Sequence, residues 1–323
     1  MKGLLCLCLF LGGIISCCYS SQAFFYDNSF ISVSSNQVIK KSLNGDLLWQ
    51  SRESSRQIVK ILFNQILTQD STSIKAMSVE NSALKWKLEI NPQTKIAVFY
   101  PYIVLYDQHK FVCLDFFTGQ EIWKKDLILQ EPIVLFDQID QLFIQDKNKR
   151  FKISLFDGKL KQLPMEEKRT TVLYVDSNKL YYQDKTHFYE QDINTLEKKI
   201  LFSASTNFFF LAFSRVVVHD EEKQKVMSYN LKFKQEDWAL PIKKDLIKKI
   251  LSYPYLVLFF KDEVRMIDLL NKEDCWQAAH DFTKKQIQSC EVSGFDGKKL
   301  YFFLTTQEIV LVNMKKQKNE NIR

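Results

Sequence analysis

The sequence predicts an all-β protein built from four-stranded antiparallel sheets repeated in tandem, and three observations lead to this fold class. Aromatic residues are abundant, with 26 phenylalanines and 13 tyrosines among 323 residues, and aromatic residues favour strands. Short apolar or alternating runs are separated by turn residues along most of the chain. Finally, all the tryptophans fall on one phase of a single period: Trp49, Trp86, Trp123, Trp238 and Trp276.

The gaps between successive tryptophans are 37, 37, 115 and 38 residues, and the longest gap equals three steps of about 38. Such a period is the length that four strands of about 5 or 6 residues and four short connections occupy. In residues 95–127 the runs KIAVFY, IVLYDQ, FVCLDF and EIWKKDL supply four strands, and residues 248–279 contain four similar runs. Each period is therefore expected to form one antiparallel sheet.

Other residue types keep the register of the tryptophans. A glycine stands four residues before the tryptophan position, and an aspartate stands eight before it, even where the tryptophan itself is missing. These repeat positions are Gly45, Gly119, Gly158, Asp115, Asp192 and Asp268. We expect the aspartate to accept backbone N–H groups in a turn, and the glycine to supply a positive φ there. The tryptophan is expected on the outermost strand, packed between adjacent sheets.

Tandem four-stranded sheets of this kind form a β-propeller, in which each sheet, or blade, covers its neighbour. Seven full repeats end near residues 51, 88, 125, 164, 202, 240 and 278, and three further strand-like runs follow. We therefore expect eight blades, the last incomplete, with seven blades as the alternative. The propeller is expected to occupy residues 23–323 as a single domain.

The segment LDFFTGQEIW (114–123) closely resembles the A-x-D-x-x-T-G-x-x-x-W repeat of the pyrroloquinoline-quinone-type β-propellers. That superfamily includes quinoprotein dehydrogenases and the non-catalytic, BamB-like outer-membrane-assembly lipoproteins. The resemblance covers nearly the whole chain after the N-terminus. It is weaker in the second, fourth and fifth repeats, where Ser82, Gln162 and Ile200 stand in glycine or tryptophan places.

The N-terminus has the pattern of an export signal. Lys2 precedes an apolar run over residues 3–15, which is too short to span a membrane. The following Ile14-Ile15-Ser16-Cys17 resembles a bacterial lipobox, so residues 1–16 are predicted to be a lipoprotein signal peptide. Cys17 would then carry the lipid and residues 17–22 would form a tether. The alternative is ordinary secretory cleavage after Ala23.

Few residues after the signal suggest chemistry. Cys113, Cys275 and Cys290 are too scattered for a disulfide framework, and buried free thiols are favoured over a Cys275–Cys290 bridge. The sequence His219-Asp220-Glu221-Glu222 is interpreted as an exposed hairpin turn and not as a metal site. The resemblance implies that quinone-binding members hold the quinone with a vicinal disulfide and a stacking tryptophan. The propeller region of this sequence has no adjacent cysteines, and all five tryptophans are accounted for by the repeat. We therefore expect no catalytic residue, cofactor or metal.

These observations favour a non-enzymatic protein-binding scaffold of the BamB-like kind, exported to the bacterial periplasm and lipid-anchored to a membrane, preferentially the outer membrane. Its expected partners are membrane-associated proteins. The net charge of +7 is spread over both signs, and the export signal argues against nucleic acid. A degenerate quinoprotein-type enzyme is one alternative. A secreted chain, or the ER-lumenal propeller of a eukaryotic secretory-pathway membrane complex, is another.

Overall fold

The computed structural model describes residues 24–313 except for short gaps. The gaps are residues 28, 131, 138–139, 147–148, 165–171, 177, 184–186, 204–207, 213–214, 221, 243–245, 253–254, 261–262, 280–286, 294–298 and 305–308. The predicted signal peptide, the Cys17 tether and the C-terminal tail lie outside the described residues. Among those that are described, all regular structure is β-strand, and no helix is long and apolar enough to cross a membrane.

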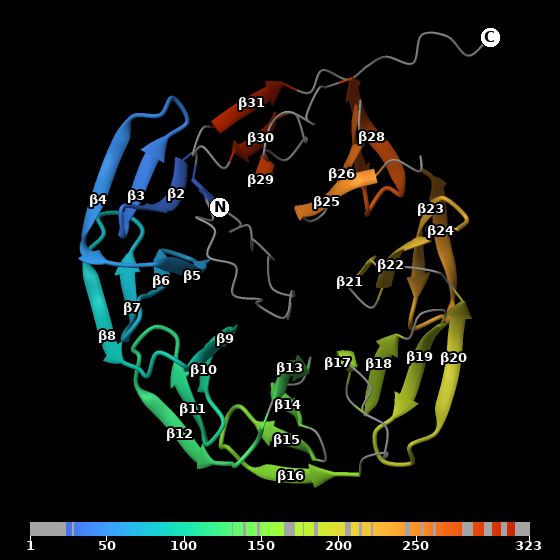
Figure 1. Ribbon diagram of the computed structural model, residues 1–323, viewed down its shortest axis with the longest axis horizontal. Helices are drawn as coiled ribbons and strands as arrows, with labels where there is room; N and C mark the ends of the chain where they lie inside the picture. The colour runs from blue at the N-terminus through green and yellow to red at the C-terminus, as the bar shows by residue number, and fades with distance from the viewer. Residues whose placement is uncertain are drawn as a thin grey trace, which may run out of the picture. The chain divides into compact units, whose positions relative to one another are not determined.

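The strands form eight consecutive antiparallel sheets, named A to H in chain order (Figure 1). Sheet A contains β1 (Phe24–Tyr26), β2 (Ser29–Ser34), β3 (Gln37–Ser42) and β4 (Leu47–Ser54), and sheet B contains β5 (Gln57–Leu62), β6 (Gln65–Gln69), β7 (Ser73–Ser78) and β8 (Leu84–Glu89). Sheet C contains β9 (Lys95–Phe99), β10 (Tyr102–Tyr106), β11 (Lys110–Asp115) and β12 (Glu121–Asp126), and sheet D contains β13 (Ile133–Asp137), β14 (Gln141–Gln145), β15 (Arg150–Ser154) and β16 (Leu160–Leu163).

Sheet E contains β17 (Val172–Asp176), β18 (Lys179–Gln183), β19 (His187–Asp192) and β20 (Lys198–Ser203), and sheet F contains β21 (Phe208–Ala212), β22 (Arg215–Asp220), β23 (Lys225–Asn230) and β24 (Gln235–Pro241). Sheet G contains β25 (Leu246–Ser252), β26 (Tyr255–Phe260), β27 (Glu263–Asp268) and β28 (Glu273–Ala279). Sheet H has three strands, β29 (Ile287–Ser293), β30 (Lys299–Leu304) and β31 (Ile309–Asn313). This is the architecture of a β-propeller, and the predicted fold class is confirmed; within the described residues the eighth sheet has three strands.

The inner strands read as continuous apolar runs because both faces of each sheet are covered. In β10 the consecutive residues Ile103, Val104 and Leu105 are all buried, and in β26 the residues Leu256 to Phe260 are buried as well. The fourth strand of each sheet is at the edge and is mostly exposed, as the pattern of β8 shows. The core therefore lies between the sheets and not in one central layer.

The chain divides into two compact units. The described part of unit 1 lies within Trp86–Ile242, and that of unit 2 lies within residues 24–85 and 246–313. In unit 1, one buried cluster joins sheets C and D through Trp123 and Leu155, and others join D to E and E to F. In unit 2, β2 lies beside β5, β1 beside β29, and β25 beside β29, so that sheets B, A, H and G are successive neighbours.

Candidate functional site

The turn between the third and fourth strands is the same in all seven four-stranded sheets. Its last residue has a positive φ and, from sheet B onward, donates its N–H to the residue four positions earlier. The positive-φ residues are Gly45, Ser82, Gly119, Gly158, Leu196, Lys234 and Lys272. Their spacing repeats the period of the tryptophans, so the turn is kept where glycine is not.

The residue that begins this turn is always small and polar. Asp115 accepts the N–H groups of Phe117 and Thr118 at 3.0 and 2.7 Å, and Asp192 and Asp268 accept two N–H groups each in the same way. In other sheets the acceptor is a residue that the sequence analysis did not identify. These acceptors are Ser42, Ser78, Ser154 and Asn230.

The structure places the predicted tryptophans on the fourth strands. Three of them donate the indole N–H to a carbonyl of the next sheet: Trp49 to Val79 at 3.0 Å, Trp86 to Phe116 at 3.3 Å and Trp123 to Leu155 at 2.8 Å. Trp238 lies half-buried in β24, opposite Ser228. Trp276 lies in β28 opposite Met266, and its side chain is outside the described part of the structure.

The glycines have a second role that the sequence analysis missed, because each makes room for the tryptophan of the preceding sheet. A Cβ atom on Gly119 would lie 2.6 Å from Cδ2 of Trp86, and one on Gly158 would lie 2.8 Å from Cγ of Trp123. Both distances are below van der Waals contact. Within a unit, a tryptophan in one sheet therefore excludes a large side chain at the positive-φ position of the next sheet.

In unit 1, larger side chains occupy the positive-φ positions of the two sheets whose preceding sheet has no tryptophan. Leu196 follows the sheet with Gln162, and Lys234 follows the sheet with Ile200. The Lys234 Nζ lies 3.0 Å from Oε1 of Glu190, on the preceding sheet, and Lys179 lies 3.2 Å from the other oxygen of the same carboxylate. Burial would raise the pKa of Glu190, but these two lysines lower it below its usual value. An ion pair thus replaces the tryptophan contact between sheets E and F.

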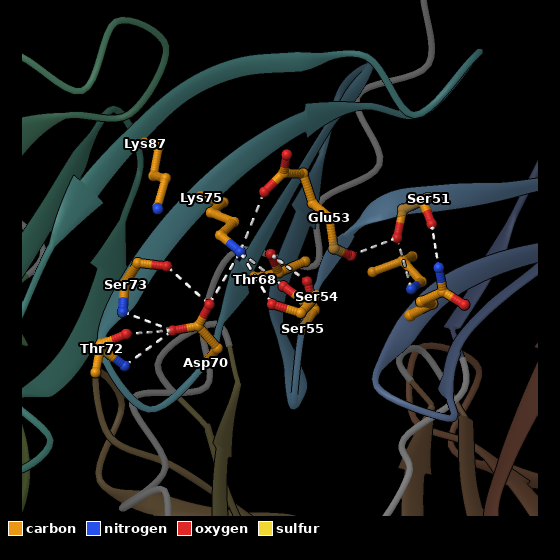
Figure 2. Close-up of polar contacts among 12 residues, drawn as sticks. Ser51, Glu53, Ser54, Ser55, Thr68, Asp70, Thr72, Ser73, Lys75 and Lys87 are labelled. Atoms are coloured by element: carbon orange, nitrogen blue, oxygen red, sulfur yellow. Dashed lines mark hydrogen bonds and ion pairs between the residues drawn. The ribbon is translucent and has the colours of Figure 1, made fainter.

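A second cluster of charges lies at the other end of the strands of sheet B, where β4 leads into β5 and β6 turns into β7 (Figure 2). Lys75 is only 3% exposed, and its Nζ lies 2.9 Å from Asp70 and 3.3 Å from Glu53. The ammonium also donates to the Ser54 carbonyl at 2.8 Å. These contacts join the end of β4 in sheet A to the β6–β7 turn of sheet B.

The carboxylate of Asp70 is the centre of this cluster. It accepts the N–H groups of Thr72 and Ser73 at 2.8 and 2.6 Å and the Ser73 hydroxyl at 2.8 Å. Burial would raise the pKa of Asp70, but the hydrogen bonds from Lys75, Thr72 and Ser73 together hold it well below its usual value. A carboxylate that is held ionised by the contacts of its own turn and by Lys75 forms a structural clamp, because it does not exchange protons near neutral pH.

Aspartates also recur at this end of the strands, and their recurrence is visible in the sequence. The segments LTQD, VLYD, FIQD and VVHD end the second strands of sheets B, C, D and F at Asp70, Asp107, Asp146 and Asp220. Asp107 accepts two N–H groups of its turn, as Asp70 does. Asp220 accepts the N–H of Lys223, so these three aspartates have the same turn-forming role as those of the turns between third and fourth strands, whereas Asp146 accepts the N–H of Gln130.

One interpretation of the sequence was wrong. His219 and Asp220 were expected in an exposed hairpin, but they are the last residues of β22 and are 8% and 1% exposed. The reason is that β22 is an inner strand whose side chains are covered on both faces of the sheet, so that residues 216–220 are all buried. Among the described residues no group of three or more histidines, cysteines or carboxylates could hold a metal ion. Cys113 and Cys275 are free thiols, and burial is the main reason that the pKa of each is raised to about 12.

Large apolar side chains are exposed in the turns between third and fourth strands. Phe156 and Phe233 are 76% and 66% exposed, and Phe117 and Leu270 occupy the same turn of sheets C and G at 37% and 56%. In sheet B, Phe63 is 55% exposed in the β5–β6 turn, which lies at the same edge because neighbouring strands run in opposite directions. Phe117, Phe156 and Leu270 stand two residues after the residue that begins the turn and Phe233 stands three after it, so large apolar side chains recur in this turn.

No protein-family model matches the sequence, and no curated protein matches it significantly. Solved structures with the same fold are numerous. BamB from Moraxella catarrhalis is 14% identical with a TM-score of 0.53, covering 93% of this chain and 96% of its own. The C-terminal WD40 domain of Sif2 is 13% identical with a TM-score of 0.61, covering 92% and 97%.

The dihydro-heme d1 dehydrogenase NirN is 12% identical to this chain with a TM-score of 0.55, covering 91% of this chain and 75% of its own. At such identities these likenesses show the β-propeller fold alone. The fold neighbours include both an enzyme and proteins of other kinds, so function has to be argued from the side chains of this chain.

Proposed function

We propose that the protein is a non-enzymatic scaffold that binds other proteins through the turns between its third and fourth strands. The observation that carries this proposal is the exposure of Phe117, Phe156 and Phe233 in this turn of three sheets of unit 1. The turn backbone is fixed by its own hydrogen bonds, so these side chains are presented on a rigid frame. Exposed aromatic side chains on rigid turns are suited to be the anchors of a protein interface.

The polar clusters on the described part of the chain support a binding role more than a catalytic one. The carboxylate of Asp70 is held ionised by the contacts of its own turn and by Lys75, and that of Glu190 by Lys179 and Lys234. Groups that act as general acids or bases instead have a pKa near the working pH. The similarity of the repeat to pyrroloquinoline-quinone-type propellers of the BamB-like kind agrees with a scaffold.

The test is capture of partners by crosslinking in cells, followed by mass spectrometry, with the full-length chain as bait. Phe156→Ser should lose the captured partner while the protein stays folded. Lys149→Ser is the matched control, because Lys149 is exposed in the β14–β15 turn, at the other end of the strands of the same sheet. Equal capture by both variants would show that the turn edge is not the binding surface.

The enzyme alternative makes a different prediction. A propeller that binds a quinone must be stabilised by it, because a ligand of the folded state raises the melting temperature. We expect no rise with saturating pyrroloquinoline quinone and Ca²⁺. A rise would overturn the scaffold proposal in favour of a quinoprotein.

We further propose that Cys17 is lipidated and that the protein is held on the periplasmic side of a bacterial membrane, with the outer membrane favoured. Two acyl chains anchor a protein stably, since each buried CH₂ contributes about 0.8 kcal/mol. Cys17→Ser should move the protein out of the membrane fraction, or leave the signal uncleaved, without changing its melting temperature. A mature N-terminus at Phe24 without lipid would instead indicate a secreted protein or one of the ER lumen.

A further inference from the structure

The outer edge of sheet D differs from the outer edges of most other sheets. The fourth strands β4, β12, β20, β24 and β28 each contain a bulge against the third strand of their sheet. A bulge interrupts the regular row of backbone groups and prevents another strand from pairing with the edge. In contrast, β16 pairs with β15 in unbroken register from Leu160 to Leu163. Sheet D therefore ends in a regular strand.

The backbone groups that face away from β15 can be assigned. Ser154 donates its N–H to the Lys159 carbonyl at 3.0 Å, which makes these two residues a hydrogen-bonded pair. In an antiparallel ladder such pairs alternate with pairs that do not bond each other. Since Ile153 faces Leu160 and Phe151 faces Gln162, the N–H and C=O groups of Leu160 and Gln162 point out of the sheet.

The strand β16 is held in place by packing against sheet E. Leu163 is 5% exposed and belongs to a buried cluster with Val175, Leu180 and Ile193 of sheet E. The other three residues of β16 are exposed, and Leu160 is 43% exposed. A rigid edge whose backbone groups point outward can pair with a further strand without losing conformational entropy of its own.

The charge around this edge indicates which kind of strand fits. The outer strands of sheets D and E, β16 (LKQL) and β20 (KKILFS), contain three lysines and no acidic residue. Lys161, Lys198 and Lys199 are all exposed, and Ile200 beside them is 52% exposed. The next outer strand, β24 (QEDWALP), contains two acidic residues and no basic one. Only the D and E edges combine aliphatic side chains with an unbalanced positive charge in this way within unit 1.

We propose that β16 is a docking edge for an extended, acidic segment of a protein partner, which adds to sheet D as a fifth antiparallel or parallel strand. The proposal rests on the scaffold function and names the chemistry of one partner. Lys161 disfavours a second copy of β16, because like charges would face each other across the new pair, and it favours a carboxylate in that position.

The test uses the purified full-length protein and a fluorescein-labelled peptide of alternating glutamate and valine, titrated by fluorescence anisotropy. Gln162→Pro removes one outward N–H and leaves the bonds to β15 intact, and proline is tolerated on edge strands. We expect it to weaken peptide binding by about tenfold, since one hydrogen bond is lost and the peptide carbonyl is left unpaired. Gln162→Ala keeps the N–H and should bind like the wild type.

Charge reversal gives a second variant that does not depend on proline. Lys161→Glu should weaken the glutamate–valine peptide and strengthen the matched lysine–valine peptide. Binding that is equal in Gln162→Pro, Gln162→Ala and wild type would overturn the proposal, as would binding only to vesicles containing phosphatidylglycerol. If partners are captured in cells but no variant of β16 changes the peptide affinity, the docking edge is wrong while the scaffold function stands.

Discussion

Replacing Trp123 by alanine is expected to be one of the most destabilising single changes. The indole is 7% exposed, lies in the cluster that joins sheets C and D, and donates to the Leu155 carbonyl. Removing a buried aromatic side chain costs roughly 3 to 5 kcal/mol through lost burial and the cavity left behind. Loss of the indole hydrogen bond to the Leu155 carbonyl adds about 1 kcal/mol. The expected loss of unfolding free energy is therefore about 4 to 6 kcal/mol.

Trp86→Ala provides the internal comparison. Trp86 is only half-buried and donates at the longer distance of 3.3 Å, so about half the loss is expected, roughly 2 to 3 kcal/mol. The measurement is urea unfolding followed by far-UV circular dichroism, because each variant removes a fluorophore. Equal losses for the two variants, or an unchanged midpoint for Trp123→Ala, would refute the assignment of Trp123 as the bridge between the sheets.

Gly158→Ala should cost roughly 1 to 3 kcal/mol more than Gly45→Ala in urea unfolding, because both have positive φ but only at Gly158 would a Cβ meet Trp123, whereas nothing lies within 4 Å of a Cβ at Gly45. Equal costs would show that the indole gives way. The depressed pKa of Asp70 contributes stability above pH 4 that is lost as the pH falls further, so Asp70→Asn should flatten the acid limb of stability between pH 5 and 2; an unchanged slope would count against the clamp. Cys113, whose pKa is raised to about 12, should not react with iodoacetamide at pH 8 until the protein is unfolded, and fast labelling of the native protein would contradict its burial.

The fold could be predicted from the sequence because the residues that recur with its period either pack between sheets or form turns. Trp123, Gly119 and Asp115 each have one physical role that few other residue types fill, so their recurrence was visible. The equivalents Ser154 and Asn230 make the same turn with a different side chain. Matching by residue identity passes over them, because what repeats is a hydrogen-bond acceptor and not an amino acid.

Other features could not be predicted because they depend on which segments become neighbours. Lys75 is the one charged residue in the strand SIKAMS, and its partner Glu53 lies on another sheet. His219 follows a strand-like run and precedes charged residues, which is also the pattern of a hairpin. Only the position of β22 inside its sheet buries it. The regular edge of β16 is a property of strand register, which residue patterns do not specify.

The contact between a tryptophan and the positive-φ residue of the next sheet limits the order in which this chain can change. A tryptophan placed at Ile200 would meet the side chain of Lys234 and break its pairing with Glu190, so Lys234 would first have to be replaced by a smaller residue. In the other direction, Gly158 cannot gain a side chain while Trp123 remains. In each of these pairs the two positions can therefore change only together, because a larger side chain at one is tolerated only after the other has made room for it.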